Sequence, residues 1–412
     1  MHVVFFNRSY YPDPEASGQF LTELAEDLAR KGERVTVVCG TSYHLDGRRR
    51  LPLPRLETHN GVRIVRIWNT RLPKSRLAFR MLNLATYLAG CLLGLCLLRR
   101  PDVVVCLTDP PLLPLLAGPY ARLAGARFVF AINDLYPDVA VGLNRISNPL
   151  LLKLLETATQ CGLRHAQVVT VLGEDMKARL LRKRCPAGKV VIMHHWADVD
   201  RIRPRKEGNE FRREHGFKPS DFLLMYSGNV GLSQGLEDLL HAVGGLEDSG
   251  GLHLLIVGEG ADKGRLQAVA AGLGLGDRVR FLPYQPKERL DQSLSAADLH
   301  VIPMSRGVTG LLVPSKAYGI MASGTPYLAV MDEGGEVARL ARRHLCGLWC
   351  PPGSVAELSL RLKSALRDRE MLAVMGANGR RAAETEFSRG AASERYHRLF
   401  CSLSSAPRRL AG

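Results

Sequence analysis

The pattern that most constrains the fold is an alternation of short β-branched runs with amphipathic helical segments, and it occurs twice along the chain. In the first half the expected strands are His2–Phe6, Val35–Cys39, Val62–Trp68, Val103–Leu107, Arg127–Ile132 and Val168–Val171. Expected helices lie between most of them, at Gly18–Lys31, Met81–Leu98, Pro111–Leu123 and Pro149–Leu163. Near-continuous apolar strands separated by helices predict a parallel sheet covered on both faces.

The same pattern starts again after an irregular stretch at His194–Pro204, which we interpret as a linker. The expected strands are Phe222–Tyr226, Leu252–Val257, Val279–Phe281, Leu299–Ile302, Tyr327–Val330 and Leu348–Cys350. The expected helices are Gln234–Leu246, Asp262–Gly272, Lys287–Ala297, Ser315–Ala322, Ser354–Asp368 and a basic final helix, Arg389–Leu403. The sequence therefore predicts an α/β protein with two doubly wound, Rossmann-like domains that face a central cleft.

Charge and length narrow the class of protein. A chain of 412 residues has room for two or three domains, and its formal charge of +16 suits an anionic ligand or an anionic membrane surface. No zinc-finger spacing, RNP-type motif or basic tail is present, so nucleic acid is not expected as a partner. The nine cysteines form no CxxC pair, which indicates a reducing compartment and no metal site. The strand-like N-terminus, His2–Phe6, gives no sign of a signal peptide.

One uncharged segment, Met81–Leu98, is long enough to be considered as a membrane span. It reads MLNLATYLAGCLLGLCLL and is flanked by Arg76, Arg80, Arg99 and Arg100. Its length is at the lower limit for a transmembrane helix, and polar residues and glycines interrupt it. We favour a buried helix or one that lies on a membrane surface, and a true span remains the alternative.

Four Gly-rich turns follow expected strands and lead into expected helices. They contain Gly18, the run SGNVGLSQG after Tyr226, the run GEG after Val257, and PMSRGVTGLLVPSK after Ile302. Backbone N–H groups without side chains in the way can approach an anion closely, and Lys316 adds a positive charge beside the last turn. An ordinary loop and helix cap is the alternative for any single turn. The expected ligand-binding residues are Gly18, Gly228, Asn229, Gly231, Gly258, Glu259, Tyr284, Gly307, Thr309, Gly310, Leu311, Ser315 and Lys316.

These motifs, in this order, resemble the retaining family 4 glycosyltransferases of the GT-B architecture. The resemblance is carried by YYPDPEASGQFLTELAEDLARKGERVTVVC, VIMHHWADVDRIRP, YSGNVGLSQGLEDLLHAV, LLIVGEGADKGRLQ, VRFLPYQPKERL, AADLHVIPM and PSKAYGIMASGTP. The run DLYPDVAV, from Asp134 to Val141, is similar to the Asp-Leu-Trp-Pro motif of enzymes that assemble colanic acid, capsule and O-antigen, including candidate fucosamine transferases.

The resemblance implies an acceptor-binding domain at residues 1–197 and a nucleotide-sugar-binding domain at 198–388. It implies that residues 389–412 form a helix that packs back toward the first domain. The implied reaction moves a sugar, with retention, from a nucleotide-sugar donor, a UDP-sugar by preference, to a lipid-linked or saccharide acceptor in cell-surface polysaccharide biosynthesis. The implied localisation is cytoplasmic, with peripheral attachment to the inner face of the cell membrane. The oligomeric state is not indicated.

The sequence departs from this family at the donor site. A glutamate pair that contacts ribose and the donor sugar in many members is replaced by Leu311 and Gly319, and the common arginine falls near Asn229. Lys316 and the backbone of the Gly-rich turns are left to bind the diphosphate. No metal and no cofactor beyond the nucleotide-sugar co-substrate is expected, because these groups can neutralise the leaving group.

Asp134 is the expected catalytic residue on the acceptor side, and Asp138 is the second candidate. Asp134 follows the strand Arg127–Ile132, where a carboxylate can orient an acceptor hydroxyl. The alternative for Asp134 is a helix cap. Two other functions stay open at this point. One is a nucleotide-sugar epimerase of the same architecture, and the other is a noncatalytic nucleotide-sugar-binding homologue.

Overall fold

The computed structural model describes the chain except residues 14, 42, 47–48, 71, 73–76, 144–145, 232–233, 247–250 and 406–412. Side chains are also left undescribed at residues 43–46, 49–52, 77–78 and 80. Arg76 and the side chain of Arg80, which flank the apolar segment, therefore lie outside the described part. The chain divides into two compact units, one formed by Met1–His194 with the residues from Ala392 on, and one formed by His195–Ala391.

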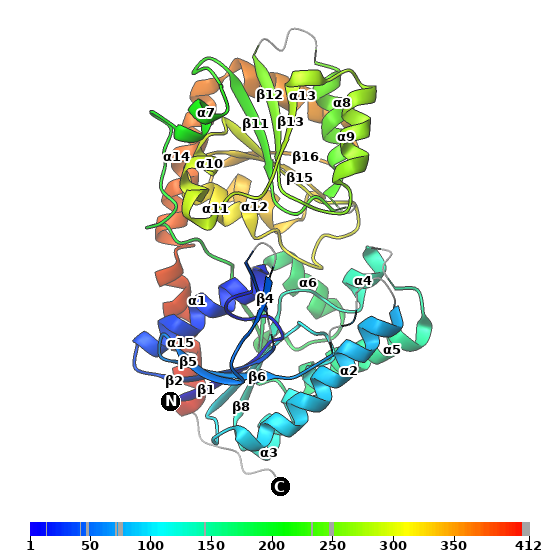
Figure 1. Ribbon diagram of the computed structural model, residues 1–412, viewed down its shortest axis with the longest axis vertical. Coiled ribbons are helices and arrows are strands. Elements are labelled where there is room, and N and C mark those ends of the chain that lie inside the picture. Colours follow the sequence, from blue (N-terminus) through cyan, green and yellow to red (C-terminus); the bar gives the residue numbers. More distant parts are fainter. Residues whose placement is uncertain are drawn as a thin grey trace. The chain divides into compact units, whose positions relative to one another are not determined.

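The first unit is built on an eight-stranded sheet with the order β10-β9-β8-β7-β1-β2-β6-β5 (Figure 1). All neighbouring strands are parallel except β5 and β6. The strands are β1 His2–Phe6, β2 Arg34–Gly40, β5 Leu56–His59, β6 Val62–Ile67, β7 Val103–Leu107, β8 Arg127–Ile132, β9 Val168–Val171 and β10 Val190–Ile192. A separate antiparallel pair is formed by β3 Tyr43–Asp46 and β4 Arg49–Pro52. The helices are α1 Ala16–Arg30, α2 Leu77–Gly94, α3 Pro114–Leu123, α4 Asp138–Gly142, α5 Pro149–His165, α6 Glu174–Arg182 and α15 Arg389–Ser405.

Two adjacent phenylalanines of β1 show how this sheet is covered. Successive side chains of a strand point to opposite faces. The ring of Phe6 packs edge-on against Tyr120 of α3, and the ring of Phe5 packs against Phe400 of α15, with centroid distances of 6.0 and 6.1 Å. The C-terminal helix α15 thus supplies part of the cover of the first sheet, and Ser393 anchors it by donating a hydrogen bond of 2.5 Å to Asp27.

The second unit contains a six-stranded parallel sheet with the order β13-β12-β11-β14-β15-β16. Its strands are β11 Phe222–Ser227, β12 Leu252–Val257, β13 Val279–Leu282, β14 Leu299–Pro303, β15 Tyr327–Val330 and β16 Gly347–Cys350. Its helices are α7 Glu210–Glu214, α8 Leu236–Gly244, α9 Lys263–Gly272, α10 Leu290–Ser295, α11 Lys316–Ala322, α12 Glu336–Arg343, α13 Val355–Arg367 and α14 Arg369–Thr385. The predicted architecture of two doubly wound α/β domains is confirmed at the level of the separate units.

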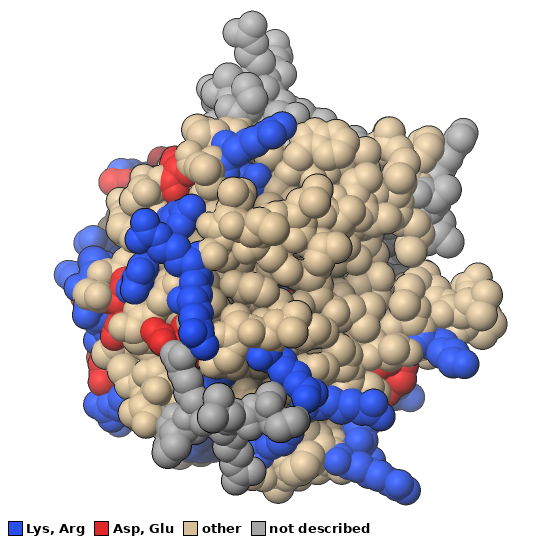
Figure 2. Space-filling model, turned by 90° about the horizontal axis from the view of Figure 1, so that it is seen from below, with Lys and Arg blue, Asp and Glu red and all other residues tan. Residues whose placement is uncertain are grey.

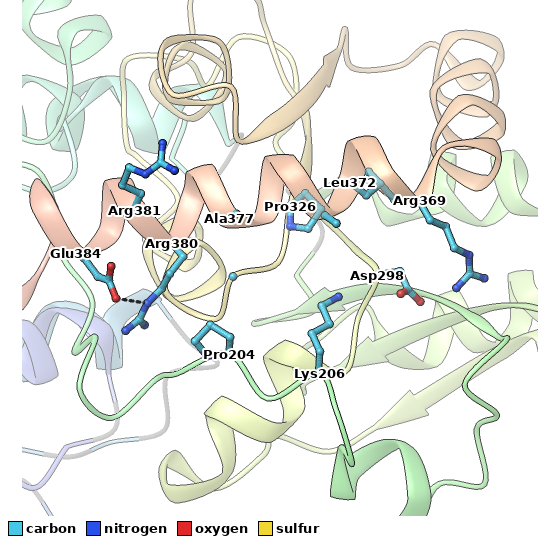
Figure 3. Close-up of a pocket in the computed structure, with 12 residues that line it drawn as sticks. Pro204, Lys206, Asp298, Pro326, Arg369, Leu372, Ala377, Arg380, Arg381 and Glu384 are labelled. Carbon is cyan, nitrogen blue, oxygen red and sulfur yellow. Dashed lines mark hydrogen bonds and ion pairs between the residues drawn. The ribbon is translucent and has the colours of Figure 1, made fainter.

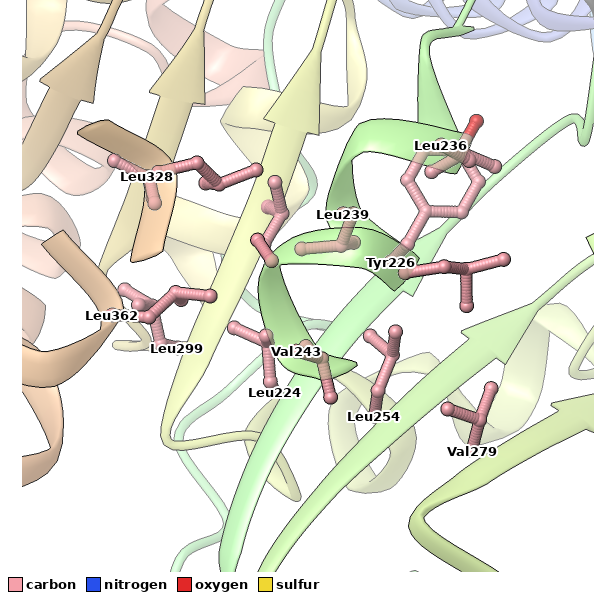
Figure 4. Packing of buried hydrophobic residues seen from close by; sticks show 14 of the residues in the cluster. Leu224, Tyr226, Leu236, Leu239, Val243, Leu254, Val279, Leu299, Leu328 and Leu362 are labelled. Carbon is pink, nitrogen blue, oxygen red and sulfur yellow. The ribbon is translucent and has the colours of Figure 1, made fainter. Parts of the chain in front are cut away.

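The core of the second unit follows the same alternation along β11. Leu224 and Tyr226 face a cluster that includes Leu239 and Val243 of α8 (Figure 4). Leu223 and Met225, one residue out of phase, belong to a second, smaller cluster, which includes Phe211 of α7 and Ala296, the residue after α10. Each fully buried aliphatic side chain contributes about 1.5–3 kcal/mol relative to exposure. Side chains on both faces of β11 are therefore apolar and buried, as expected for a central strand of a parallel sheet.

The structure differs from the sequence prediction in strands and in helices. The edge strands β5 and β10 and the separate pair β3 and β4 were not predicted. The predicted helix Lys287–Ala297 is a 3-10 turn, Lys287–Arg289, followed by the short α10. The apolar segment forms α2, which begins four residues earlier than expected and ends in a 3-10 turn at Leu95–Leu97. Within the described residues, no helix combines the length and the apolar character needed to span a membrane.

Helices α4, α6, α7, α12 and α14 were not predicted, and α14 shows the physical reason. Its sequence contains Gly376 and Gly379, which lower intrinsic helix propensity. A Cβ atom on Gly376 would lie 2.2 Å from the carbonyl oxygen of Gly324. The glycine that weakens the helix signal is thus the residue that allows α14 to pack on the turn after α11. Tertiary packing here outweighs local propensity.

We predict that Gly376→Ala destabilises the protein by several kcal/mol, because the added methyl group must displace backbone atoms of Gly324. Gly264→Ala in α9 is the matched control, since a Cβ there meets nothing within 4 Å and alanine favours a helix by about 1 kcal/mol. Guanidinium unfolding of the two variants measures the difference. Equal stability of Gly376→Ala and the unmodified protein would contradict the packing argument.

Candidate active site

Two Gly-rich turns touch each other at the carboxyl edge of the second sheet. Gly228 follows β11 and Gly258 follows β12, and a Cβ atom on Gly258 would lie 1.9 Å from the carbonyl oxygen of Gly228. Gly258 also has a φ of +151°, which disfavours other residues. The N–H of Val230 donates to the carbonyl of Glu259 at 2.9 Å and fastens the two turns together. These glycines therefore have a packing role, and their contact with a ligand stays a prediction.

Lys316 lies against the first of these turns. It is the first residue of α11, and its Nζ lies 3.9 Å from the centroid of the Tyr226 ring. The same Nζ lies 2.8 Å from the place that a Cβ on Gly228 would occupy. The hydroxyl of Tyr226 donates to the carbonyl of Asn229 at 2.6 Å, which holds the ring beneath the lysine. The structure thus brings together Lys316, Gly228 and Asn229, which the sequence predicted, with Tyr226, which it did not.

The surroundings of Lys316 are electrostatically unusual. Burial lowers the pKa of its amine from 10.5 to about 7. No carboxylate in the described part of the chain is paired with it, and the face of the Tyr226 ring offers the nearest compensation for its charge. Such an amine gains a proton when an anion binds beside it. The group can therefore serve as an anion-binding residue that is neutral or charged near pH 7.

The loop between β14 and α11 holds the other predicted residues. Gly307 and Gly310 have φ of +79° and +75°, which favour glycine, and the N–H of Gly307 donates to Asp332 at 3.3 Å. Leu311 is 2 % exposed, so its side chain belongs to the core. Thr309 and Leu312 form an isolated parallel β-bridge.

Ser315 is the residue before α11, but its side chain makes no capping hydrogen bond there.

The remaining predicted residues of this unit lie beside the second turn. The carboxylate of Glu259 is 2.7 Å from Nζ of Lys263, so its charge is compensated within the turn and the start of α9. The hydroxyl of Tyr284, which is 52 % exposed, donates to the carbonyl of Glu259 at 3.4 Å. Gly231 lies close to Asn229, because an added Cβ would be 2.9 Å from its Nδ2.

Gly18, the remaining predicted binding residue, belongs to the first unit. It lies in α1, and a Cβ there would be 3.2 Å from the carbonyl carbon of Ser9. Glycine at this position lets α1 approach the turn after β1. Gly18 therefore has a packing role within the first unit, and its contact with a ligand stays a prediction.

The two predicted aspartates of the first unit have different surroundings. Asp134 follows β8, and its N–H and that of Asn133 both donate to Oγ1 of Thr108, at 3.2 and 3.3 Å. This ties the loop to the end of the neighbouring strand β7. Asp138 begins α4, and its carboxylate lies 2.7 Å from Nζ of Lys183. The ion pair favours a role of Asp138 in stability.

A polar cluster at the same edge of the first sheet was missed by the sequence prediction. Arg8 lies 3.1 Å from Asp109, and the hydroxyl of Ser9 donates to Asp109 at 3.2 Å and also to Glu15. Burial raises the pKa of Asp109, although Arg8 acts in the opposite direction. Asp109 follows β7 in the run LTDPP, so its position after a strand was the available signal. The run contains no glycine, whereas most of the predicted binding residues lie in Gly-rich turns.

One group of potential metal ligands lies in the first unit. Single ligand atoms of Glu33, His397 and Cys401 are within 4.8 Å of one another. The Glu33 carboxylate already lies 2.8 Å from His397 Nε2 and 2.7 Å from the amine of Met1. These ion pairs and hydrogen bonds account for the cluster as part of the packing of α15.

The sequence matches two family descriptions that together cover most of both units. Residues 16–196 match the Glycosyl transferase 4-like domain, and residues 207–382 match the Glycosyl transferases group 1 family. The chain is a glycosyltransferase, with a 4-like domain followed by a group 1 domain. The predicted family membership and the assignment as an enzyme, a transferase, are thereby confirmed.

Two curated relatives of this glycosyltransferase are similar over much of its length. WcaI of Escherichia coli, named as a candidate colanic acid biosynthesis glycosyl transferase, is 27% identical over 89% of this chain and 92% of the relative. WbjE of Pseudomonas aeruginosa, named as a candidate glycosyltransferase, is 30% identical over 63% of this chain and 65% of the relative.

Solved structures support the fold. A sucrose-phosphate synthase from Thermosynechococcus elongatus superimposes with a TM-score of 0.80, at 18% identity and over 99% of this chain and 100% of its own. WaaG, a glycosyltransferase involved in lipopolysaccharide biosynthesis, has a TM-score of 0.71 at 17% identity, over 98% of this chain and 100% of its own. At these identities the likeness concerns the fold alone.

We predict that Asp134→Asn and Asp138→Asn affect different properties of the glycosyltransferase. Asp134→Asn keeps the size of the side chain, and we expect a loss of turnover of roughly two powers of ten with a melting temperature within a few degrees. Asp138→Asn breaks the pair with the partly exposed Lys183, so we expect a stability loss of about 1 kcal/mol or less and nearly full turnover. Thermal unfolding and single-turnover rates measure both. Full activity of Asp134→Asn would leave that residue with a structural role.

Proposed function

We propose that this glycosyltransferase moves a sugar from a nucleotide-sugar donor, of the UDP-sugar class, to a lipid-linked or saccharide acceptor in the synthesis of a cell-surface polysaccharide. The observation that carries the proposal is the buried amine of Lys316, held over Tyr226 against the turn at Gly228. A diphosphate placed there would meet a cation and backbone N–H groups without an intervening side chain.

The donor class is supported by a structural neighbour. Anabaena HepE, with a TM-score of 0.74 and 15% identity, was solved in complex with UDP and in complex with UDP-glucose. Breaking the bond between the sugar and the diphosphate builds negative charge on the leaving phosphate. A protonated Lys316 favours that state more than the intact donor, so it would assist the reaction. In this proposal neither a metal ion nor a separate cofactor takes part.

The acceptor class is supported by the names of relatives. WcaI is named for colanic acid biosynthesis, and the structural neighbour WaaG is involved in lipopolysaccharide biosynthesis. In the first unit Asp134 is the residue proposed to orient the acceptor hydroxyl. The nearby Asp109, whose pKa is raised by burial, is a further carboxyl group at the same sheet edge.

A nucleotide-sugar epimerase of the same architecture is the alternative, and the comparisons do not favour it, because the matching families and named relatives are glycosyltransferases. The two reactions differ in one requirement. Transfer consumes an acceptor, whereas epimerisation proceeds without one.

We predict that Lys316→Ala weakens binding of UDP-glucose by about tenfold or more, because one charge-assisted contact is lost. The sign of the pH effect follows from the lowered pKa of about 7. At pH 8 the free amine is mostly neutral, so binding should take up a proton, and affinity should fall as pH rises above 7. The variant should show neither effect.

Calorimetry at pH 8 in buffers of different ionisation enthalpy measures the proton uptake, and a panel of UDP- and GDP-sugars with and without acceptor measures transfer. Lys363→Ala, an exposed lysine of α13, is the control for net charge. Binding without a proton change in the unmodified protein would remove Lys316 from the donor site.

We also propose that α2 attaches the first unit to an anionic membrane surface on the cytoplasmic side. Leu92, Leu93 and Leu97 are 59 %, 76 % and 50 % exposed, and Arg99 and Arg100 follow directly. Apolar side chains beside basic ones are typical of interfacial attachment. Figure 2, which views the molecule from below, shows Lys and Arg side chains gathered along one side of a broad area without charged residues.

We predict that the unmodified protein floats with anionic vesicles at low salt and that Leu92→Ser with Leu93→Ser reduces the bound fraction about tenfold or more. Leu360→Ser in α13 removes a leucine of similar exposure, 58 %, from the second unit and should have no effect. If the protein stays in the soluble fraction at low salt, or if both variants bind equally well, the attachment site is wrong.

A further inference from the structure

A cavity of about 610 Å³ lies in the second unit at the edge of the sheet opposite to the Gly-rich turns. One wall is α14, and the others are the turn Gly324–Pro326, the segment Pro204–Lys206 and Asp298 (Figure 3). Asp298 directly precedes β14 and Pro326 directly precedes β15, so these residues mark the amino ends of parallel strands. Lys316 and the Gly-rich turns follow carboxyl ends. The cavity is therefore separate from the proposed donor site.

The acidic groups of this cavity are already compensated. The carboxylate of Asp298 accepts hydrogen bonds from Arg212 at 2.5 Å and from the N–H of Leu223 at 2.8 Å. Glu384 accepts from Nε of Arg380 at 2.7 Å. Arg380 in turn donates to the carbonyls of Ile202, Ala322 and Val199, which fixes it as a structural residue.

Three cations that line the cavity, Lys206, Arg369 and Arg381, have no carboxylate partner among the described residues. Nζ of Lys206 donates to the carbonyl of Ala297 at 2.7 Å, and Arg369 donates to the carbonyl of Ser220 at 2.7 Å. Figure 3 shows both side chains on the same side of α14, near Asp298, whereas Arg381 points away from them. Lys206, Arg369 and Arg212 surround one carboxylate, which leaves a net charge of about +2 at this end of the cavity.

The charges around Lys206 favour an anion beside it. Desolvation lowers the pKa of its amine, Asp298 acts in the opposite direction, and Arg212 and Arg369 lower it further. Like charges held close together destabilise a folded protein unless an anion lies between or beside them.

The floor of the cavity is apolar. Leu372, Ala373 and Ala377 of α14 face Pro204 and Pro326 across it. Alanines on the helix leave the space open, and the close approach of Gly376 to the carbonyl of Gly324 fixes the distance between the walls. The volume lies in the range of small-molecule sites.

We propose that this cavity binds a small phosphate monoester, with the dianionic phosphate between Lys206 and Arg369 and the carbon skeleton against the exposed residues Ala373 and Ala377 of α14. A phosphate dianion matches the charges of Lys206 and Arg369, and a guanidinium group binds it through parallel N–H bonds. The apolar floor distinguishes an organic phosphate from the free ion. The proposal does not depend on the donor site or on the transfer reaction.

Phenyl phosphate is the probe, because it joins a dianion to an apolar ring, and phenol and inorganic phosphate are its two halves. We expect calorimetry on the full chain to show phenyl phosphate binding with a Kd on the order of 1 mM or below, and weaker binding of each half. Lys206→Ala and Arg369→Gln should each weaken binding about tenfold or more. Lys363→Ala and Lys316→Ala should leave it unchanged.

Three results would overturn the proposal: no binding of phenyl phosphate at roughly ten times that concentration, unchanged binding in Lys206→Ala, or an equal loss in Lys363→Ala. A loss confined to Lys316→Ala would assign the probe to the donor site instead. Arg369 also lies over the ring of Phe222, at 5.4 Å from its centroid, so Arg369→Gln could lower stability. Lys206 makes no such ring contact, so Lys206→Ala alone is sufficient for the test if Arg369→Gln fails to fold.

Discussion

The contact between the backbone atoms of Gly228 and Gly258 determines the geometry of the candidate donor site. No side chain fits at residue 258, because the carbonyl of Gly228 occupies the place of its Cβ. The two turns can therefore lie in direct contact at the ends of β11 and β12. The first turn is then placed so that Lys316 packs against it and over Tyr226. A glycine selected as a ligand-binding residue thus acts first through packing, and any ligand would meet a surface that this packing has already shaped.

Lys316 illustrates a conflict between stability and binding. An amine with a pKa near 7 is destabilising when it is charged, because the surrounding protein solvates it poorly. A nearby glutamate would relieve this cost and would also occupy the position of an incoming phosphate. The two positions for which the family resemblance implies glutamate are Leu311, which is buried, and Gly319, where a Cβ would lie near Leu294 and Ile202. The apolar surroundings leave the amine without such a partner.

The twelve strands that were predicted agree with the structure to within one residue at each end, but the short strands β3, β4, β5 and β10 and the helices α4, α6, α7, α12 and α14 were not predicted. Strands such as Val103–Leu107 and Leu252–Val257 are apolar on both faces and end at polar or glycine residues, so local composition alone defines them. Helix α14 is defined by a contact with Gly324, more than 40 residues earlier in the chain, and α10 is shortened by the preceding turn. Where such a helix begins and ends depends on the residues that pack against it, and these residues lie outside its own sequence.

The same distinction applies to the candidate site. Lys316 and the Gly-rich turns could be identified because their residue types are unusual after a strand. Tyr226 and Asp109 could not, since an aromatic residue at the end of an apolar strand and an Asp-Pro step are common in cores and turns. What gives Tyr226 its role is the approach of α11 from 90 residues further along the chain, and what makes Asp109 unusual is its burial beside Arg8. Residue type and position after a strand indicate where a site lies, and the electrostatic character of each group follows from long-range packing.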